Sequence, residues 1–155
     1  MKKIIALALI LMFVLPLAGC GKGDDSNGKT NDGMQNEWGI TLEAENVMPG
    51  GLSLVCHQSG GDGVSELQTG SFYVIQRLEE AGWTDVAYAP QEYEVAWTTE
   101  AWIIQRENTT TWDVNWEWLY GELPAGEYRI GKEFMNFRGP GDYDNKVLYT
   151  DFVIE

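Results

Sequence analysis

Histidine and cysteine are almost missing from this sequence, which holds one histidine, His57, and two cysteines, Cys20 and Cys56. Zinc centres and histidine-based catalytic triads draw on several such residues, and no cluster with metal-ligand spacing occurs. A nucleophile elbow and a glycine-rich phosphate loop are missing too. We therefore predict a protein that is not an enzyme and has no catalytic residues, no cofactor and no metal site.

Lysine and arginine are scarce as well. Ten basic residues stand against 24 aspartates and glutamates, and the formal net charge is −14 at pH 7. Nucleic acid and anionic lipid headgroups attract basic surfaces, so we expect no nucleic-acid partner and a domain that stands off the membrane. Cations, cationic peptides and basic proteins fit this charge, but so does an acidic surface that only keeps the protein soluble.

The sequence also has no apolar run of the ~20 residues that a membrane-spanning helix needs. Its uncharged apolar run, residues 4–15, follows the basic start "MKK" and precedes the small residues of "PLAGC". This order is typical of a secretory signal peptide. The stretch "LAGC" at 17–20 resembles the lipobox of bacterial lipoproteins. The alternative is an ordinary signal peptide that holds a cysteine there by chance.

The lipobox resemblance implies that diacylglycerol is attached to Cys20 through a thioether and that the chain is cleaved before this residue. The protein would then be anchored to the cell membrane through Cys20, on the extracytoplasmic face. Two acyl chains suffice for stable anchoring, because each buried methylene contributes about 0.8 kcal/mol. Cleavage removes Lys2 and Lys3, which changes the formal charge from −14 to −16.

The chain is thus predicted to have three segments. The signal peptide covers 1–19, and the lipidated cysteine begins a Gly-, Asp- and Asn-rich tether that covers 20–37. A tether of this composition is flexible and spans about 20–25 Å. Residues 38–155 have the length of one domain and no internal repeat, and we expect this domain to be monomeric.

The domain shows short segments with the period-two alternation of strands, separated by turns that contain glycine or proline. No window has sustained helical periodicity. We predict an all-β fold, an immunoglobulin-like antiparallel sandwich of seven to eight strands without a disulfide. The strands are expected at 38–46, 51–57, 71–79, 83–88, 95–105, 110–120, 126–136 and 146–154.

Two positions have structural roles in this prediction. Tyr128 begins a strand after the turn "LPAG", where a tyrosine corner would direct its hydroxyl back to the turn. Cys56 shares its parity with Leu52 and Leu54, so it is expected to point inward as a small buried apolar residue. Ile130 stands where an antibody domain has its second cysteine, and Cys56 stands where the first would be.

Two long segments carry a family resemblance. They are "GLSLVCHQSGGDGVSELQTGSFYVIQRLEE" at 51–80 and "NWEWLYGELPAGEYRIGKEFMNFRGPGDYD" at 115–144. Both resemble a bacterial immunoglobulin-like domain family that occurs in secreted and lipid-anchored proteins of Firmicutes. The resemblance covers essentially all of 38–155 and implies a β-sandwich at the cell surface. It implies no catalytic residues and no particular ligand.

The segment 110–120 raises the question of a binding site. Its even positions are apolar: Trp112, Val114, Trp116, Trp118 and Tyr120. Since each strand of a sandwich buries one face, most of these side chains are expected in the core. Their bulk would bring one end, Trp112 or Tyr120, to the rim, where a ligand platform would form together with Trp97 and Trp102.

Oxygen-bearing side chains gather in two turns, with Asp62 in one and Asp142, Asp144 and Asn145 in the other. Such loops can hold calcium. Asp and Asn also favour turns through local backbone bonds, and this is the explanation we prefer.

Three functions remain open at this point. A protein-interaction or scaffold module at the outer face of the cytoplasmic membrane comes first. A carbohydrate-binding module for glycans is the alternative, and an accessory or sensor subunit of a membrane enzyme comes third. Exposed coplanar aromatic rings would indicate a sugar site, whereas an apolar patch or an unprotected edge strand would indicate a protein partner.

Overall fold

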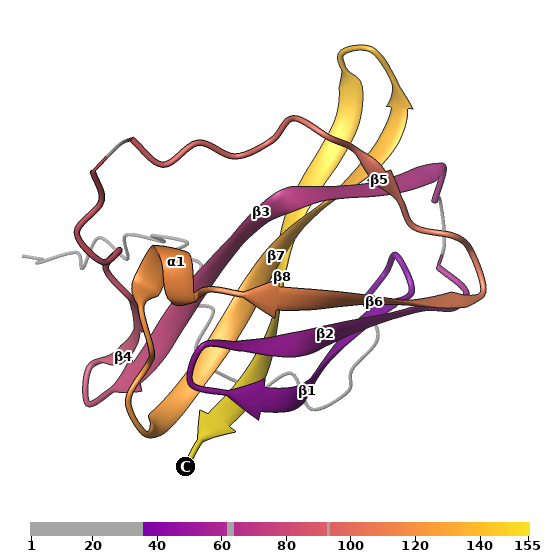
Figure 1. Ribbon diagram of the computed structural model, residues 1–155. Coiled ribbons are helices and arrows are strands. Elements are labelled where there is room, and N and C mark those ends of the chain that lie inside the picture. Colours follow the sequence, from indigo (N-terminus) through magenta and orange to yellow (C-terminus); the bar gives the residue numbers. More distant parts are fainter. Residues whose placement is uncertain (1–35, 62–63, 93) are drawn as a thin grey trace, which may run out of the picture.

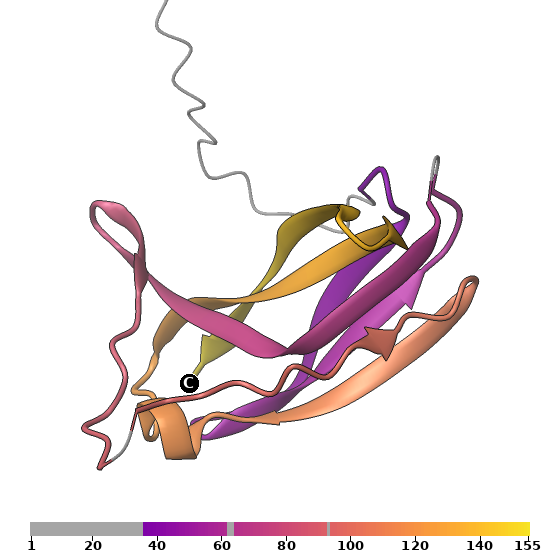
Figure 2. The same ribbon diagram turned by 90° about the horizontal axis from the view of Figure 1, so that it is seen from above.

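The computed structural model describes residues 36–61, 64–92 and 94–155. The predicted signal peptide, Cys20 and the tether up to residue 35 lie outside the described residues, as does Asp62. Two antiparallel sheets face each other as a sandwich (Figure 1, Figure 2). The predicted all-β, immunoglobulin-like fold is therefore confirmed. No helix in the described part of the chain is long or apolar enough to cross a membrane.

The smaller sheet has three strands in the order β1-β2-β6. They are β1 (Ile40–Met48), β2 (Gly51–Gln58) and β6 (Asn108–Asn115). The larger sheet has the order β4-β3-β7-β8, and a short β5 pairs with the opposite end of β3 from β4. Its strands are β3 (Glu66–Glu79), β4 (Gly82–Asp85), β5 (Trp102–Ile103), β7 (Gly126–Gly139) and β8 (Asp142–Ile154).

The core forms because each strand turns alternate side chains toward the other sheet. On β7 the buried, inward positions are Tyr128, Ile130, Lys132, Phe134 and Asn136. Cys56 of β2 is fully buried and is a free thiol. The Tyr128 hydroxyl donates a 2.9 Å hydrogen bond to the carbonyl of Pro124, which is the bond that defines a tyrosine corner.

The strand predicted at 95–105 is largely wrong, because only Trp102–Ile103 form a strand there. This part of the chain leaves β4 in the larger sheet and must reach β6 in the smaller one (Figure 1). It runs along the edge of β3 as an irregular segment, where the Ser71 hydroxyl donates to the Thr98 carbonyl. Because the segment crosses from one sheet to the other, it cannot stay paired with β3 along its whole length. The alternation in its sequence therefore does not produce a continuous strand.

The strand predicted at 110–120 is correct only up to Asn115. A one-turn helix, α1 (Glu117–Tyr120), follows. Just before its start, the Asn115 side chain accepts a 3.1 Å hydrogen bond from the Glu117 amide. The change from period two to a helical turn buries Trp116 and Tyr120 but turns Trp118 outward, where it is 52% exposed.

Candidate binding surface

The four aromatic residues predicted to form a ligand platform do not come together in one site. Trp97 lies in the irregular segment before β5, Trp102 lies on β5 and Trp112 on β6. Tyr120 ends α1 and is only 7% exposed. Its hydroxyl accepts a 3.3 Å hydrogen bond from the Ile75 amide, and burial raises its pKa. Of the two residues expected at the rim, Tyr120 is therefore buried, whereas Trp112 is half-buried.

Trp102 and Trp112 do meet, with ring centroids 6.4 Å apart and an angle of 24° between the planes. The pair covers a buried ammonium, because Lys132 Nζ lies 5.2 Å from one ring and 5.1 Å from the other. The same Nζ donates a 2.6 Å hydrogen bond to the carbonyl of Gly70. Burial lowers the pKa of Lys132 to about 8, while the ring faces favour the cation. Both indoles are half-buried and already contact a cation from the inside.

Trp97 belongs to a second aromatic cluster. Its ring meets Phe72 at 5.3 Å and 78°, and Trp118 at 6.0 Å and 65°. These are edge-to-face contacts. They stabilise the corner formed by β3, α1 and the irregular segment, but they do not produce the common plane on which a sugar ring stacks.

The outer face of the three-stranded sheet is polar. Its outward positions, which alternate with core residues, are Thr41, Glu43, Glu45, Ser53, Val55, His57, Thr109, Thr111 and Asp113. The one apolar residue of this set, Val55, is only 5% exposed because it lies between Glu43 and Thr111 on the neighbouring strands. His57 contacts Thr109 Oγ1 at 2.8 Å through Nδ1.

The outer face of the larger sheet is different. Six of the nine large apolar side chains that are exposed in the described part of the chain lie on it: Phe72, Leu78, Ile103, Tyr143, Val147 and Val153. Between them lie half-buried apolar residues of the same face: Val74, Trp83, Met135, Phe137 and Tyr149. We call these eleven residues the outer apolar face. It extends over β3, β4, β5, β7 and β8, on the side of the sandwich away from the smaller sheet (Figure 2).

One cation lies within this face. The Arg129 guanidinium carbon is 4.6 Å from the Trp83 ring centroid and 4.2 Å from that of Tyr149. Arg129 Nε donates a 2.6 Å hydrogen bond to Gln76 Oε1. The Tyr149 ring covers Gly131, where an added Cβ would lie 2.5 Å from Cε1 of that ring. The centre of the outer apolar face is therefore closely packed.

A family model described as Bacterial Ig-like domain matches residues 35–153. The chain belongs to this family. Bacterial Ig-like domains are usually non-catalytic, which agrees with a sequence that lacks catalytic motifs. No curated protein and no solved structure matches the chain.

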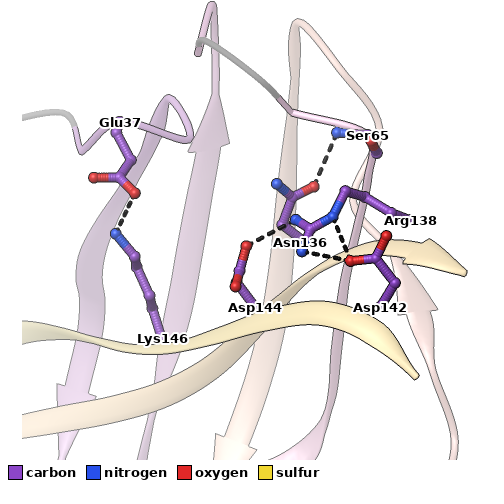
Figure 3. Close-up of polar contacts among 7 residues, drawn as sticks. All are labelled: Glu37, Ser65, Asn136, Arg138, Asp142, Asp144 and Lys146. Atoms are coloured by element: carbon purple, nitrogen blue, oxygen red, sulfur yellow. Dashed lines mark hydrogen bonds and ion pairs between the residues drawn. The ribbon is translucent and has the colours of Figure 1, made fainter. Parts of the chain in front are cut away.

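The acidic turn of the Ig-like domain, between β7 and β8, binds a side chain of the protein itself. Arg138 Nε lies 2.8 Å from Asp142 Oδ1, and Arg138 Nη1 lies 2.7 Å from Asp144 Oδ2 (Figure 3). In the same view, Lys146 of β8 pairs with Glu37, and Asn136 accepts from the Ser65 amide. Across the described residues, no three His, Cys, Asp or Glu side chains come together as metal ligands.

The outer apolar face of the Ig-like domain was not predicted from the sequence, although part of its signal is visible. In "KVLYTDFVI" of β8, apolar residues occupy both parities, with Val147, Tyr149 and Val153 on one and Leu148, Phe152 and Ile154 on the other. An antiparallel strand with one solvated face should alternate more cleanly. Apolar residues on both parities indicate that the second face is also used for contacts.

Proposed function

We propose that this chain is a lipid-anchored cell-surface protein whose single, non-catalytic Ig-like domain binds another protein. Cys20 carries the lipid, and the domain works at the outer face of the cytoplasmic membrane. The observation behind the binding role is the contrast between the two sheets: one outer face is polar, and the other carries eleven exposed and half-buried apolar side chains.

Both sheets stabilise the fold through their inner faces, which share one core. Stability therefore does not explain why the outer face of the larger sheet is apolar and that of the smaller sheet is polar. Single exposed apolar residues are ordinary, but many exposed apolar side chains gathered on one face favour contact with another molecule. Val153, at 59% exposed, and Ile103, at 53%, remain largely exposed in the isolated domain. A protein partner would remove this apolar surface from water, which contributes roughly 25 cal/mol per Å².

A sugar-binding role has less support. The near-parallel aromatic pairs of the described residues are Trp102–Trp112, Trp116–Phe152 and Tyr128–Phe152. The last two pairs lie in the core. The first covers Lys132. The exposed rings of Phe72, Tyr88 and Trp118 meet their neighbours edge to face.

The anchor is tested by labelling producing cells with an alkyne-bearing fatty acid and measuring label on the purified chain. We expect label on the wild type and on Cys56→Ala, and none on Cys20→Ala. The Cys56 variant is the matched control because it removes the other cysteine. Equal labelling of all three chains would refute lipidation at Cys20.

The binding role is tested with a photo-crosslinking amino acid placed at Val147 or Val153 in the full chain on cells. We expect a discrete protein adduct from these two positions. The matched controls are Thr41 and Thr111, on the outer face of the smaller sheet, which should give none. Adducts of equal yield from both faces, or glycan adducts in place of protein, would contradict the proposal.

A further inference from the structure

We infer that the partner of the outer apolar face is a basic protein segment, one that carries Lys or Arg on both sides of apolar side chains. This inference rests on the proposed function and specifies the chemistry of its partner. It follows from the charges that surround the outer apolar face and from the way its single cation is held.

The outward positions of β3, β4, β7 and β8 hold more acidic than basic residues. Five are carboxylates, namely Glu66, Asp85, Glu127, Glu133 and Asp151, and one is the guanidinium of Arg129. They lie among the apolar residues in register: Val153 pairs with Glu127, and Val147 pairs with Glu133. A segment that covers the apolar side chains therefore passes carboxylates on both sides, and basic residues would complement them.

Arg129 is a single cation among five carboxylates, and of these its charge acts on Asp151. It is stacked between Trp83 and Tyr149 and bonded to Gln76, whose amide donates in turn to Asp85 Oδ1 at 2.6 Å. Asp151 is its cross-strand neighbour. No ion pair joins the side chain of Glu127 or of Glu133 to a basic group of the described chain.

Asp151 is exposed on this face, next to Arg129 on the neighbouring strand. Burial raises its pKa, and the charge of Arg129 opposes that rise. A cation brought by a partner would add its attraction for Asp151 to that of Arg129. The interaction would therefore favour a basic group over a neutral one at this position.

The same charges argue against two other occupants. A second copy of the chain would bring its own carboxylates against these, and like charges in contact are costly. An anionic membrane surface would be repelled by a domain of this charge, since the whole chain carries a formal −14. A basic protein segment satisfies both the apolar and the acidic parts of the surface.

The packed centre favours tight binding. The rings of Trp83 and Tyr149 hold Arg129, and Tyr149 is pressed onto Gly131. Side chains that are already ordered lose little rotamer freedom when a partner binds, so less of the gained contact energy is lost to entropy.

The test uses the full lipidated chain in phosphatidylcholine nanodiscs, which are neutral, and a displayed library of random 15-residue peptides. We expect the selected peptides to be enriched about twofold or more in Lys and Arg, together with aliphatic or aromatic residues. Their affinity should fall about tenfold as NaCl is raised from about 50 to about 500 mM, because salt screens exposed charges.

Three double variants, one of them a control, locate the binding. Glu127→Gln with Glu133→Gln should weaken the selected peptides about threefold or more at low salt, by removing two exposed charges. The matched control, Glu43→Gln with Glu45→Gln on the other sheet, should leave their affinity unchanged. Val147→Ser with Val153→Ser should weaken the peptides at every salt concentration, and thermal melts should show that all variants are folded.

The outcomes separate this inference from the proposed function. Peptides that are apolar without basic enrichment, insensitive to salt, and lost in the Val147→Ser/Val153→Ser chain would overturn the basic partner but leave protein binding at this face intact. Peptides that bind all variants equally would overturn both, as would a library that yields no binder.

Discussion

At the scale of single residues, the unusual position is Lys132. Its side chain is only 3% exposed and lies on the core face of β7, a place where lysine is rare unless it is paired. Its partners are the Gly70 carbonyl and the faces of Trp102 and Trp112. No carboxylate is among them, so hydrogen bonding and two cation–π contacts alone offset the cost of burying the charge.

We predict that Lys132 makes stability depend on pH in a defined window. Its pKa is lowered from 10.5 to about 8 in the folded protein. Below pH 8 the ammonium is charged in both states, so the burial penalty is fully present. Between pH 8 and 10.5 the folded protein releases the proton while the unfolded chain keeps it. The free energy of unfolding should therefore rise across this window, by at most about 3 kcal/mol.

The measurement is urea unfolding at pH 7, 8, 9 and 10 for the wild type and for Lys132→Met. The variant cannot titrate at this position, so the wild type should gain stability relative to it as the pH rises. Burial raises the pKa values of Cys56 and Tyr73 to about 12. These two groups lower the free energy of unfolding as the pH rises, and they do so in both proteins. A stability difference that stays flat from pH 7 to 10 would contradict the lowered pKa.

A second prediction at this scale concerns two glycines of β7. Gly131→Ala should destabilise the domain by about 1–3 kcal/mol, because the new Cβ would lie 2.5 Å from Tyr149 and 2.9 Å from Val74. Gly139→Ala is the matched control, since nothing lies within 4 Å of the Cβ added there. Equal melting temperatures for the two variants would show that Tyr149 moves aside without cost.

At the scale of elements, α1 decides which tryptophans serve the core. Trp116 is fully buried, stacks on Phe152 at 5.5 Å and donates to the Pro49 carbonyl at 2.8 Å. Trp118, two residues later, is half exposed. The helical turn separates two residues that a continued strand would have placed on one face.

We therefore predict unequal effects for two alanine variants. Trp116→Ala should lower the free energy of unfolding by about 3–5 kcal/mol, the usual range for a large buried aromatic residue. Trp118→Ala should lower it by about 1 kcal/mol or less, because it removes mainly a surface contact. Denaturant titrations followed by far-UV circular dichroism compare the two variants. Similar losses of unfolding free energy would contradict the unequal burial of Trp116 and Trp118.

The β7–β8 turn is the second element with a testable property. Its carboxylates, Asp142 and Asp144, are paired with Arg138. A calcium ion would have to displace this guanidinium and still find further oxygen ligands. We expect thermal melts in calcium and in EDTA to coincide, and a higher melting temperature in calcium would show that the turn is a cation site after all.

At the scale of the whole molecule, the sandwich has two unlike outer surfaces and a strongly acidic balance. The apolar surface alone would favour self-association. The carboxylates among its residues oppose it, because two such faces would bring like charges together. We predict a monomer at about 100 µM in about 150 mM NaCl, as measured by sedimentation velocity, and a dimer there would contradict the charge argument.

How much could be read from the sequence differs between features. The alternation of β2 and β7 is local, so their positions and the burial of Cys56 follow from spacing alone. The tyrosine corner is also local, because Tyr128 and Pro124 lie four residues apart in the chain. Local alternation also predicts a strand at 95–105. The path of this segment instead depends on its crossing from one sheet to the other, which a local pattern does not show.

The sequence by itself determined the fold class, the acidic balance and the local motifs, because periodicity, charge and turn residues act over a few positions. Only the tertiary structure decided where the outer apolar face lies. Trp83, Arg129 and Tyr149 come from three different strands and meet only because β4, β3, β7 and β8 pair in that order. Contacts between distant strands depend on register and sheet order, and these are properties of the assembled sandwich.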